Sequence, residues 1–236
     1  MSMIYLFRHG QASFGDDDYD VLSPRGLAQA RILAGILYDK GFMPVAVYSG
    51  TMRRQVSTAQ EVLRFFKDSD RPLPGLVTMP EFDEYDTAAI VTALFPAMAA
   101  EDPSLEADLP RMYESKAAFK RIFEAAMLRW VSLGAHVDGV ESWEGLKSRV
   151  MRGVDSIRRR HGRGSTVAVF TSGGVIAACL AAVLGIPGET AMRLNWQIVN
   201  TSVTRLMYNE ERVTLAGFND ISHLELARDE SLLTYR

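Results

Sequence analysis

Cysteine is nearly absent from this sequence: Cys179 is the only one among 236 residues. A single cysteine cannot form an intramolecular disulfide, so we expect a protein of a reducing, cytoplasmic environment. Cys179 lies in an apolar run, which favours a small core side chain over a nucleophile. Histidine is also scarce, and the four histidines lack a ligand-like spacing, which argues against a zinc site.

Long hydrophobic runs and a strong net charge are lacking as well. The most membrane-like segment, residues 167–187, is interrupted by Thr171-Ser172-Gly173-Gly174, which indicates a buried strand, a turn and a helix. The first apolar run ends at Arg8 and is too short for a signal peptide. A formal net charge of -3 disfavours a broad nucleic-acid-binding surface but permits a local cationic pocket. We therefore expect neither a membrane nor a nucleic-acid partner.

The remaining composition, with 47% hydrophobic and 23% charged residues, is that of an ordinary globular protein. Six short apolar segments have the length and pattern of β-strands: 3–7, 45–48, 76–79, 167–170, 202–208 and 213–218. Helical patterns lie between most of them. This alternation predicts an α/β fold, a three-layer α/β/α sandwich with a mostly parallel central sheet, in one domain over residues 1–236.

Local signals place two helices and a turn. Ser23 is a candidate N-cap before Pro24, which suits the first helical position. Ser142 can cap a second helix that runs to about Arg160. Residues 209–211 fit a turn between the last two strands.

Residues 87–141 have a different texture from the rest of the chain. They are helical in pattern, rich in Ala, Met, Glu and Arg, and contain no convincing strand; Pro96, Pro103 and Pro110 divide them. We expect a helical insertion that forms a cap over the ligand pocket, whose predicted position is described next, and that carries substrate selectivity.

Unusual residues follow the predicted strands. Arg8-His9-Gly10 ends the first strand, Arg54 follows the second, and Ser172-Gly173-Gly174 follows the fourth. If the strands are parallel neighbours, these loops share one edge of the sheet, where α/β proteins bind ligands. Two arginines and a helix N-terminus at one edge suit a phosphate group. We therefore expect phosphate-binding roles for Arg8, Arg54, Ser172 and Gly173, and a small phosphorylated substrate or phosphate as the ligand.

His9 would then be a nucleophile toward phosphorus that forms a phosphohistidine, which water hydrolyses. A carboxylic acid would protonate the leaving alkoxide and then act as a base toward water. Glu81, on the loop after the third strand, is the first choice and Glu84 the second. This chemistry needs no metal or other cofactor. A metal at Asp16, Asp17 and Asp18 is conceivable, but adjacent aspartates are more often a solvated loop.

These blocks together resemble the histidine phosphatase superfamily, which includes cofactor-dependent phosphoglycerate mutases and acid phosphatases. The resemblance covers most of the chain: Arg8-His9-Gly10 is similar to the signature, and residues 22–30, 49–59 and 170–176 are similar to later blocks. The spacing to Thr58 selects Arg54 over Arg53 as the second phosphate-binding arginine. Glu81 falls where the family usually places its general acid.

One departure from the family concerns Ser172, which stands where the family usually has a second histidine. A serine hydroxyl can donate one hydrogen bond but carries no charge. Loss of such a donor at comparable sites costs about 10²–10³ in rate. Among possible substitutes, His223 is the first to examine, whereas His136 and His161 are expected at the surface.

A second departure is the absence of the Glu-Arg-His-Tyr-Gly stretch typical of the glycolytic mutases, since residues 80–84 differ from it. The sequence therefore favours a phosphomonoester hydrolase. A catalytically impaired phospho-ligand-binding or regulatory protein is the alternative, and a phosphoglycerate mutase is a third.

Overall fold

The computed structural model describes residues 1–13, 20–112, 114–133 and 137–235. Its centre is a six-stranded sheet in the order β3-β2-β4-β1-β5-β6. The strands are β1 (Ser2–Arg8), β2 (Ala46–Ser49), β3 (Leu76–Thr78), β4 (Thr166–Thr171), β5 (Val203–Tyr208) and β6 (Val213–Asp220). The first four run parallel, and β5 and β6 are antiparallel additions at one edge. The predicted mostly parallel sheet is confirmed, as are all six strands.

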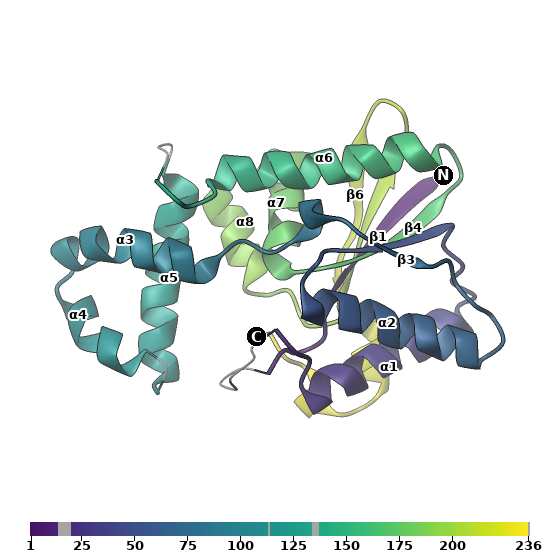
Figure 1. The fold of residues 1–236 in the computed structure, drawn as a ribbon, viewed down its shortest axis with the longest axis horizontal. Coiled ribbons are helices and arrows are strands. Elements are labelled where there is room, and N and C mark those ends of the chain that lie inside the picture. The colour runs from purple at the N-terminus through teal and green to yellow at the C-terminus, as the bar shows by residue number, and fades with distance from the viewer. Residues whose placement is uncertain (14–19, 113, 134–136, 236) are drawn as a thin grey trace.

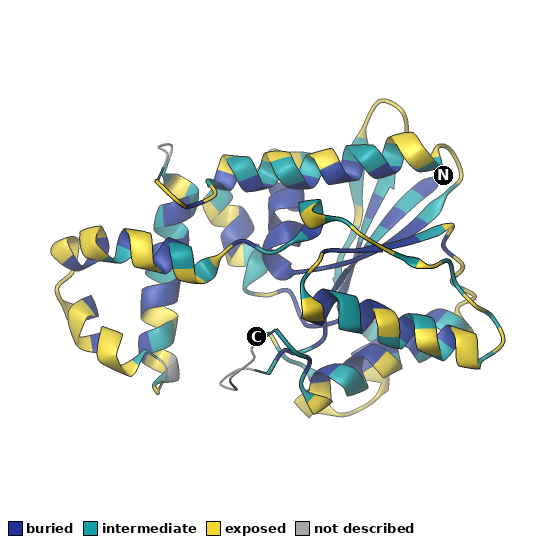
Figure 2. Cartoon of the chain, in the orientation of Figure 1, coloured by how far each residue is buried: buried dark blue, intermediate teal, exposed yellow. Residues whose placement is uncertain are grey.

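Helices cover both faces of this sheet (Figure 1). Helices α1 (Pro24–Asp39) and α2 (Arg53–Asp68) pack on one face, with the short α9 (Ser222–Leu226) beside α1. Helices α6 (Trp143–His161) and α7 (Gly173–Leu184) pack on the other, and α8 (Gly188–Asn195) follows α7. Both faces of the central strands are therefore apolar: in β1, Ile4 and Leu6 face α6 and α7, whereas Phe7 faces α1 and α2. Figure 2 shows the central strands buried between the helices.

The predicted caps are present. The Ser23 hydroxyl oxygen accepts a hydrogen bond from the Gly26 N–H at 3.0 Å, and Pro24 is the first residue of α1. Ser142 caps α6 in the same way through the Gly145 N–H. At the predicted turn between β5 and β6, the Asn209 side chain accepts hydrogen bonds from the N–H groups of Glu211 and Arg212.

Between β3 and α6 the chain forms helices α3 (Thr87–Glu101), α4 (Ser104–Asp108) and α5 (Lys116–Ser132), which lie beyond the end of the sheet (Figure 1). Short 3₁₀ turns occupy Pro80–Phe82, Leu109–Arg111 and, near the C-terminus, Glu230–Leu232. The prediction that Pro96 divides this stretch is wrong, because Pro96 lies inside α3. Buried side chains continue on both sides of it, from Ile90 to Met98, so packing outweighs the lost backbone hydrogen bond.

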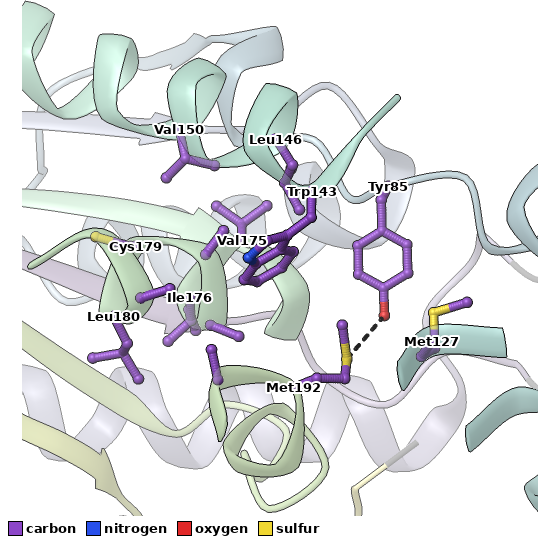
Figure 3. Close-up of a cluster of buried hydrophobic side chains, with 14 of the residues drawn as sticks. Tyr85, Met127, Trp143, Leu146, Val150, Val175, Ile176, Cys179, Leu180 and Met192 are labelled. Carbon is purple, nitrogen blue, oxygen red and sulfur yellow. Dashed lines mark hydrogen bonds between the residues drawn. The ribbon is translucent and has the colours of Figure 1, made fainter. Parts of the chain in front are cut away.

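A buried aromatic cluster joins these helices to the sheet-bound ones. The rings of Trp130 on α5 and Trp143 on α6 meet edge to face, with centroids 5.5 Å apart. Tyr85, just before α3, directs its hydroxyl toward the sulfur of Met192 at 3.9 Å (Figure 3). Since these side chains are buried, α3–α5 have a fixed position beside the carboxyl ends of the parallel strands.

Cys179 is buried in the same cluster, as the sequence predicts, and burial raises the pKa of its thiol to about 12. Such a thiol stays protonated and is a poor nucleophile. None of the helices in the described part of the chain has both the length and the apolar character needed to cross a membrane.

Candidate active site

A cavity of about 1050 Å³ lies where β1 and β4 end. Its lining includes Arg8, His9, Arg54 and Gly173, four of the six residues predicted for the site. The pairing of β1 with β4 accounts for this meeting, because Arg8 is in register with Thr171, two positions before Gly173. Residues separated by most of the chain thus reach one edge of the sheet.

His9 is buried and held in one orientation. Its Nδ1 lies 2.7 Å from the Gly10 carbonyl oxygen, which can only accept, so we assign the ring proton to Nδ1. The other nitrogen, Nε2, accepts a hydrogen bond from Nε of Arg54 at 3.2 Å. Burial, followed by the charges of Arg54 and Arg8, holds the pKa of His9 well below its usual value, against the opposing hydrogen bond to Gly10. The imidazole is therefore neutral at physiological pH and keeps a lone pair on Nε2.

The backbone around His9 is tied to two other segments. The Gly10 N–H donates to the Thr58 hydroxyl at 3.0 Å, and that hydroxyl donates to the Arg54 carbonyl at 2.7 Å. On the other side, the Asn200 amide donates to the His9 carbonyl at 2.9 Å. A side chain at position 10 would overlap the Gly26 carbonyl, so the close approach of β1 to α1 requires glycine there.

Both arginines are buried, with 8% of Arg8 and 7% of Arg54 exposed. Arg8 donates to the Ile198 carbonyl oxygen through its Nη1. Arg54 forms a salt bridge of 2.6 Å with Asp20, whose other oxygen accepts from the Arg53 N–H at 2.8 Å. Arg53 itself is exposed and outside the cavity lining, whereas Arg54, the arginine selected by the sequence spacing, is in that lining. Burial with fixed partners gives both guanidinium groups a defined position.

The two candidate acids lie on different sides of their loop. Glu84 lines the cavity, where its carboxylate accepts from the Gly174 N–H at 3.1 Å and the Tyr85 N–H at 3.2 Å. Glu81 is outside the lining; its Cβ packs beside Gly153 of α6, where an added Cβ would lie 2.9 Å away. The structure thus brings Glu84, the second choice from the sequence, into the cavity of His9, and it leaves Glu81 against α6.

The environment of Glu84 favours a protonated carboxyl. Burial raises its pKa, and this effect exceeds the opposing influence of Arg54, the N–H groups of Gly174 and Tyr85, and Arg8. A carboxylic acid that retains its proton closer to neutral pH can donate that proton to a leaving group.

Ser172 is fully buried and lies outside the cavity lining, although its neighbour Gly173 lies within it. Its hydroxyl oxygen accepts a hydrogen bond from the Gln55 amide at 2.7 Å, and the same amide donates to the Phe82 carbonyl at 3.1 Å. The contacts of Ser172 therefore link α2, the Phe82 loop and the start of α7. In this arrangement Ser172 contributes to the framework of the site, and Gly173 presents the N-terminus of α7 to the cavity.

The described histidines other than His9 lie outside the cavity lining. The imidazole of His223 is buried, with Nε2 at 3.0 Å from the Thr201 hydroxyl. The His161 imidazole lies 2.8 Å from the Tyr48 hydroxyl. Tyr48 faces the α6 and α7 side of the sheet, away from α2. His136 and the acidic run Asp16–Asp18 lie outside the described residues.

Asn195, the last residue of α8, is a cavity residue that sequence reasoning missed. Its amide oxygen lies against Gly173, where a side chain would overlap it, and its amide nitrogen donates to the Tyr85 hydroxyl at 3.4 Å. Asn195 belongs to no motif and follows no strand. Only the path of α8 back over α7 brings it to the site.

Comparisons with known proteins identify relatives of the chain. The profile of the histidine phosphatase superfamily (branch 1) matches residues 4–109 and 84–221. Comparison with curated proteins gives no match.

Several solved structures share the fold. A phosphoglycerate mutase from Bacillus anthracis has a TM-score of 0.65 at 20% identity, with 97% of each chain covered. A phosphoserine phosphatase from Entamoeba histolytica, in complex with 3-phosphoglyceric acid, has a TM-score of 0.65 at 18% identity, with 95% of this chain and 100% of the other covered. A mycobacterial glucosyl-3-phosphoglycerate phosphatase has a TM-score of 0.62 at 21% identity over 92% and 98%. At these identities the likeness shows the fold.

Proposed function

The chain belongs to the histidine phosphatase superfamily, branch 1, and we propose that it is a phosphomonoester hydrolase that uses His9 as its nucleophile. The observation that carries this proposal is the state of His9: a neutral, buried imidazole that lines a cavity together with buried Arg8 and Arg54, and whose Nε2 accepts a hydrogen bond from Arg54. An unprotonated nitrogen beside fixed positive charge is what attack on a phosphate monoester requires.

Arg8, Arg54 and the N-terminus of α7 at Gly173 would hold the phosphoryl group. Guanidinium groups match phosphate oxygens in bidentate fashion, and a helix N-terminus adds partial positive charge. The bond that Arg54 makes to Nε2 of His9 would give way to bonds with phosphate oxygens, which frees the lone pair for attack.

In the first step, Nε2 of His9 would form a bond to phosphorus while the bond from phosphorus to the ester oxygen breaks. Glu84 would give its proton to that oxygen, so that the product leaves as a neutral alcohol. In the second step, the Glu84 carboxylate would take a proton from water as the water oxygen attacks phosphorus. The bond to Nε2 then breaks, inorganic phosphate leaves, and Glu84 is again protonated.

The alternative function is phospho-ligand binding without efficient turnover, and Ser172 is the observation that favours it. Its hydroxyl is bonded to Gln55 and buried away from the cavity, so it supplies neither the charge nor the reach of the histidine usual in the family. Asn195 does not replace that histidine, because its amide oxygen lies against Gly173 and its amide nitrogen donates to the Tyr85 hydroxyl. The two functions share the binding site and differ in whether the phosphohistidine forms.

The test compares the wild-type protein with His9→Ala on p-nitrophenyl phosphate in the presence of a metal chelator. We expect turnover by the wild type and a loss of at least about 10³-fold in the variant. Acid-labile, base-stable labelling of the wild type by a radiolabelled substrate would identify the phosphohistidine. The matched control is His161→Ala, which removes a histidine outside the cavity.

Turnover that survives in His9→Ala, or that disappears in chelator, would contradict the proposed mechanism. Tight binding of phosphate with neither turnover nor labelling would instead support the phospho-ligand-binding alternative. Efficient exchange between phosphoglycerates by the wild type would support a mutase.

A further inference from the structure

The cavity has two chemically different ends. Beyond the arginines and His9, its wall is formed mainly by apolar side chains of the helical segment, among them Val91, Phe95, Leu109, Met112, Phe119 and Phe123. They come from α3, the turn after α4, and α5. The rings of Phe119 and Phe123 stack with centroids 5.6 Å apart and planes within 15°. An apolar surface of this kind, facing a cavity, favours an apolar ligand group.

Several of these side chains remain partly accessible in the protein, including Phe95, Met112 and Phe119, and Leu109 is 44% exposed. Removing apolar surface from water stabilises the complex between protein and ligand. A group that fills this end of the cavity would cover these side chains, whereas a small polar group would leave them in contact with water.

The charges of the lining point the same way. Among its described residues, the cations are Arg8 and Arg54, both at the phosphate end and both engaged there. The acidic side chains of that lining are Glu84, whose pKa is raised by burial so that its neutral form is favoured, and Asp86. Asp86 is exposed and caps α3 through the Ala89 N–H at 2.9 Å. A second anionic group on the substrate would therefore meet apolar side chains or the Asp86 carboxylate, and neither arginine would remain to bind it.

The size of the cavity extends the argument. Its volume of about 1050 Å³ is at the upper end of pockets that hold drug-sized ligands, roughly 300–1,000 Å³. A phosphoryl group occupies a small part of such a volume, so the alcohol portion of the substrate has room for a ring system or a branched chain.

We propose that the substrate is a phosphate monoester of a large apolar alcohol, aromatic or branched aliphatic, that carries no second anionic group. This inference rests on the proposed function, since the phosphoryl group must bind at Arg8 and Arg54 for the alcohol portion to reach the helical wall. The same lining disfavours carboxylated monoesters and bisphosphates, because both arginines bind the first phosphoryl group.

The test measures binding, not turnover, with phosphonates that the protein cannot hydrolyse. Calorimetric titration of the full chain would compare propylphosphonate with 1-naphthylmethylphosphonate for size, and with 3-phosphonopropionate for charge. We expect the naphthyl compound to bind at least tenfold more tightly than propylphosphonate, about 1.4 kcal/mol. The carboxylate of 3-phosphonopropionate should weaken binding at least about threefold.

Phe119→Ala should reduce the naphthyl preference at least about threefold and leave propylphosphonate binding unchanged. Phe95→Ala, on a different helix, is a second variant in case the first does not fold. Phe65→Ala is the matched control, because Phe65 is also a partly buried phenylalanine, lies on α2 against Tyr38, and is outside the cavity lining. It should leave the preference unchanged.

Equal affinity for the naphthyl and propyl compounds would overturn the inference, as would affinity for 3-phosphonopropionate that matches or exceeds that for propylphosphonate. In both cases the phosphonates still bind, so the proposed phosphate site stands. If neither the phosphonates nor inorganic phosphate bind, the phosphate site of the proposed function fails and the inference fails with it.

Discussion

Nε of Arg54 lies 3.2 Å from Nε2 of His9; His9 follows β1, and Arg54 lies in the first turn of α2. The same guanidinium group forms a salt bridge with Asp20, so its position is fixed from the opposite side. Its charge also lowers the pKa of His9. Arg54 thus adds to the effect of burial, which is the larger cause of the lowered pKa of His9.

Arg54→Lys should lower kcat/KM by about 10²–10³-fold, because an ammonium group cannot reproduce a fixed bidentate guanidinium contact. Arg53→Lys is the matched control and should change kcat/KM by less than about twofold, since Arg53 is exposed and outside the cavity lining. Steady-state kinetics on p-nitrophenyl phosphate would measure both. Equal effects of the two substitutions would contradict the assignment of Arg54.

Glu84→Gln should lower kcat by about 10²–10⁴-fold for a substrate with a poor alkoxide leaving group, because glutamine has no proton to give. The loss should be smaller for p-nitrophenyl phosphate, whose leaving group needs little protonation. Glu81→Gln changes a side chain outside the cavity lining and should leave both rates nearly unchanged. A larger loss from Glu81→Gln than from Glu84→Gln would restore Glu81 as the acid.

The free energy of unfolding should fall as the pH drops from about 6.5 to about 4, in part because of His223. Burial lowers the pKa of His223 to about 4, with Lys40 acting in the same direction and Asp220 against it. Between these values the unfolded chain binds a proton that the folded protein does not, so acid favours unfolding. The full shift is worth roughly 3 kcal/mol.

His223→Gln keeps a side chain that can bind the Thr201 hydroxyl and removes the titration, so it should flatten this dependence. Denaturant unfolding of both proteins at a series of pH values would measure it. His161→Gln is the control, because His161 is more accessible and should contribute less to the slope. An unchanged slope in His223→Gln would show that His223 is protonated in the folded protein.

Ser172→Ala should destabilise the protein by about 1 kcal/mol, because it removes an acceptor of the buried Gln55 amide. It should reduce turnover by less than about tenfold, because the hydrogen bond of the Ser172 hydroxyl goes to Gln55, which lies outside the cavity lining. Ser202→Ala is a matched control: the Ser202 hydroxyl is buried and has no hydrogen-bond partner among the described residues. Thermal melting and steady-state kinetics would separate the two effects. A loss of about 10³-fold in Ser172→Ala would show that the hydroxyl acts on the phosphoryl group.

The sequence predicts the strands well because both faces of the sheet are covered. Segments such as Val167–Phe170 are continuously apolar, and polar residues, glycine or charged residues follow them directly. This change in composition marks where each buried strand ends. Ser23 and Ser142 are predictable for a similar reason, since their capping bonds are local.

The sequence does not show which of Glu81 and Glu84 lines the cavity. The 3₁₀ turn at Pro80–Phe82 directs Phe82 into the core and leaves Glu81 beside α6, and only after it does the chain reach the cavity at Glu84. Asn195 and the Gln55–Ser172 bond depend on contacts between distant segments, which no local pattern encodes. The Pro96 prediction was wrong because the buried packing of α3 outweighs the backbone hydrogen bond that proline removes.

The register of β1 bears on how the protein folds during synthesis. The partners of β1 are β4 and β5, which begin at Thr166 and Val203, so a ribosome makes the first strand long before either partner exists. Its apolar side chains, Ile4, Leu6 and Phe7, have no partner strands to pack with while about two thirds of the chain is synthesised. Such distant pairing slows folding. We therefore expect the nascent chain to depend on chaperones, and the phosphate site to appear only after β4 has left the ribosome.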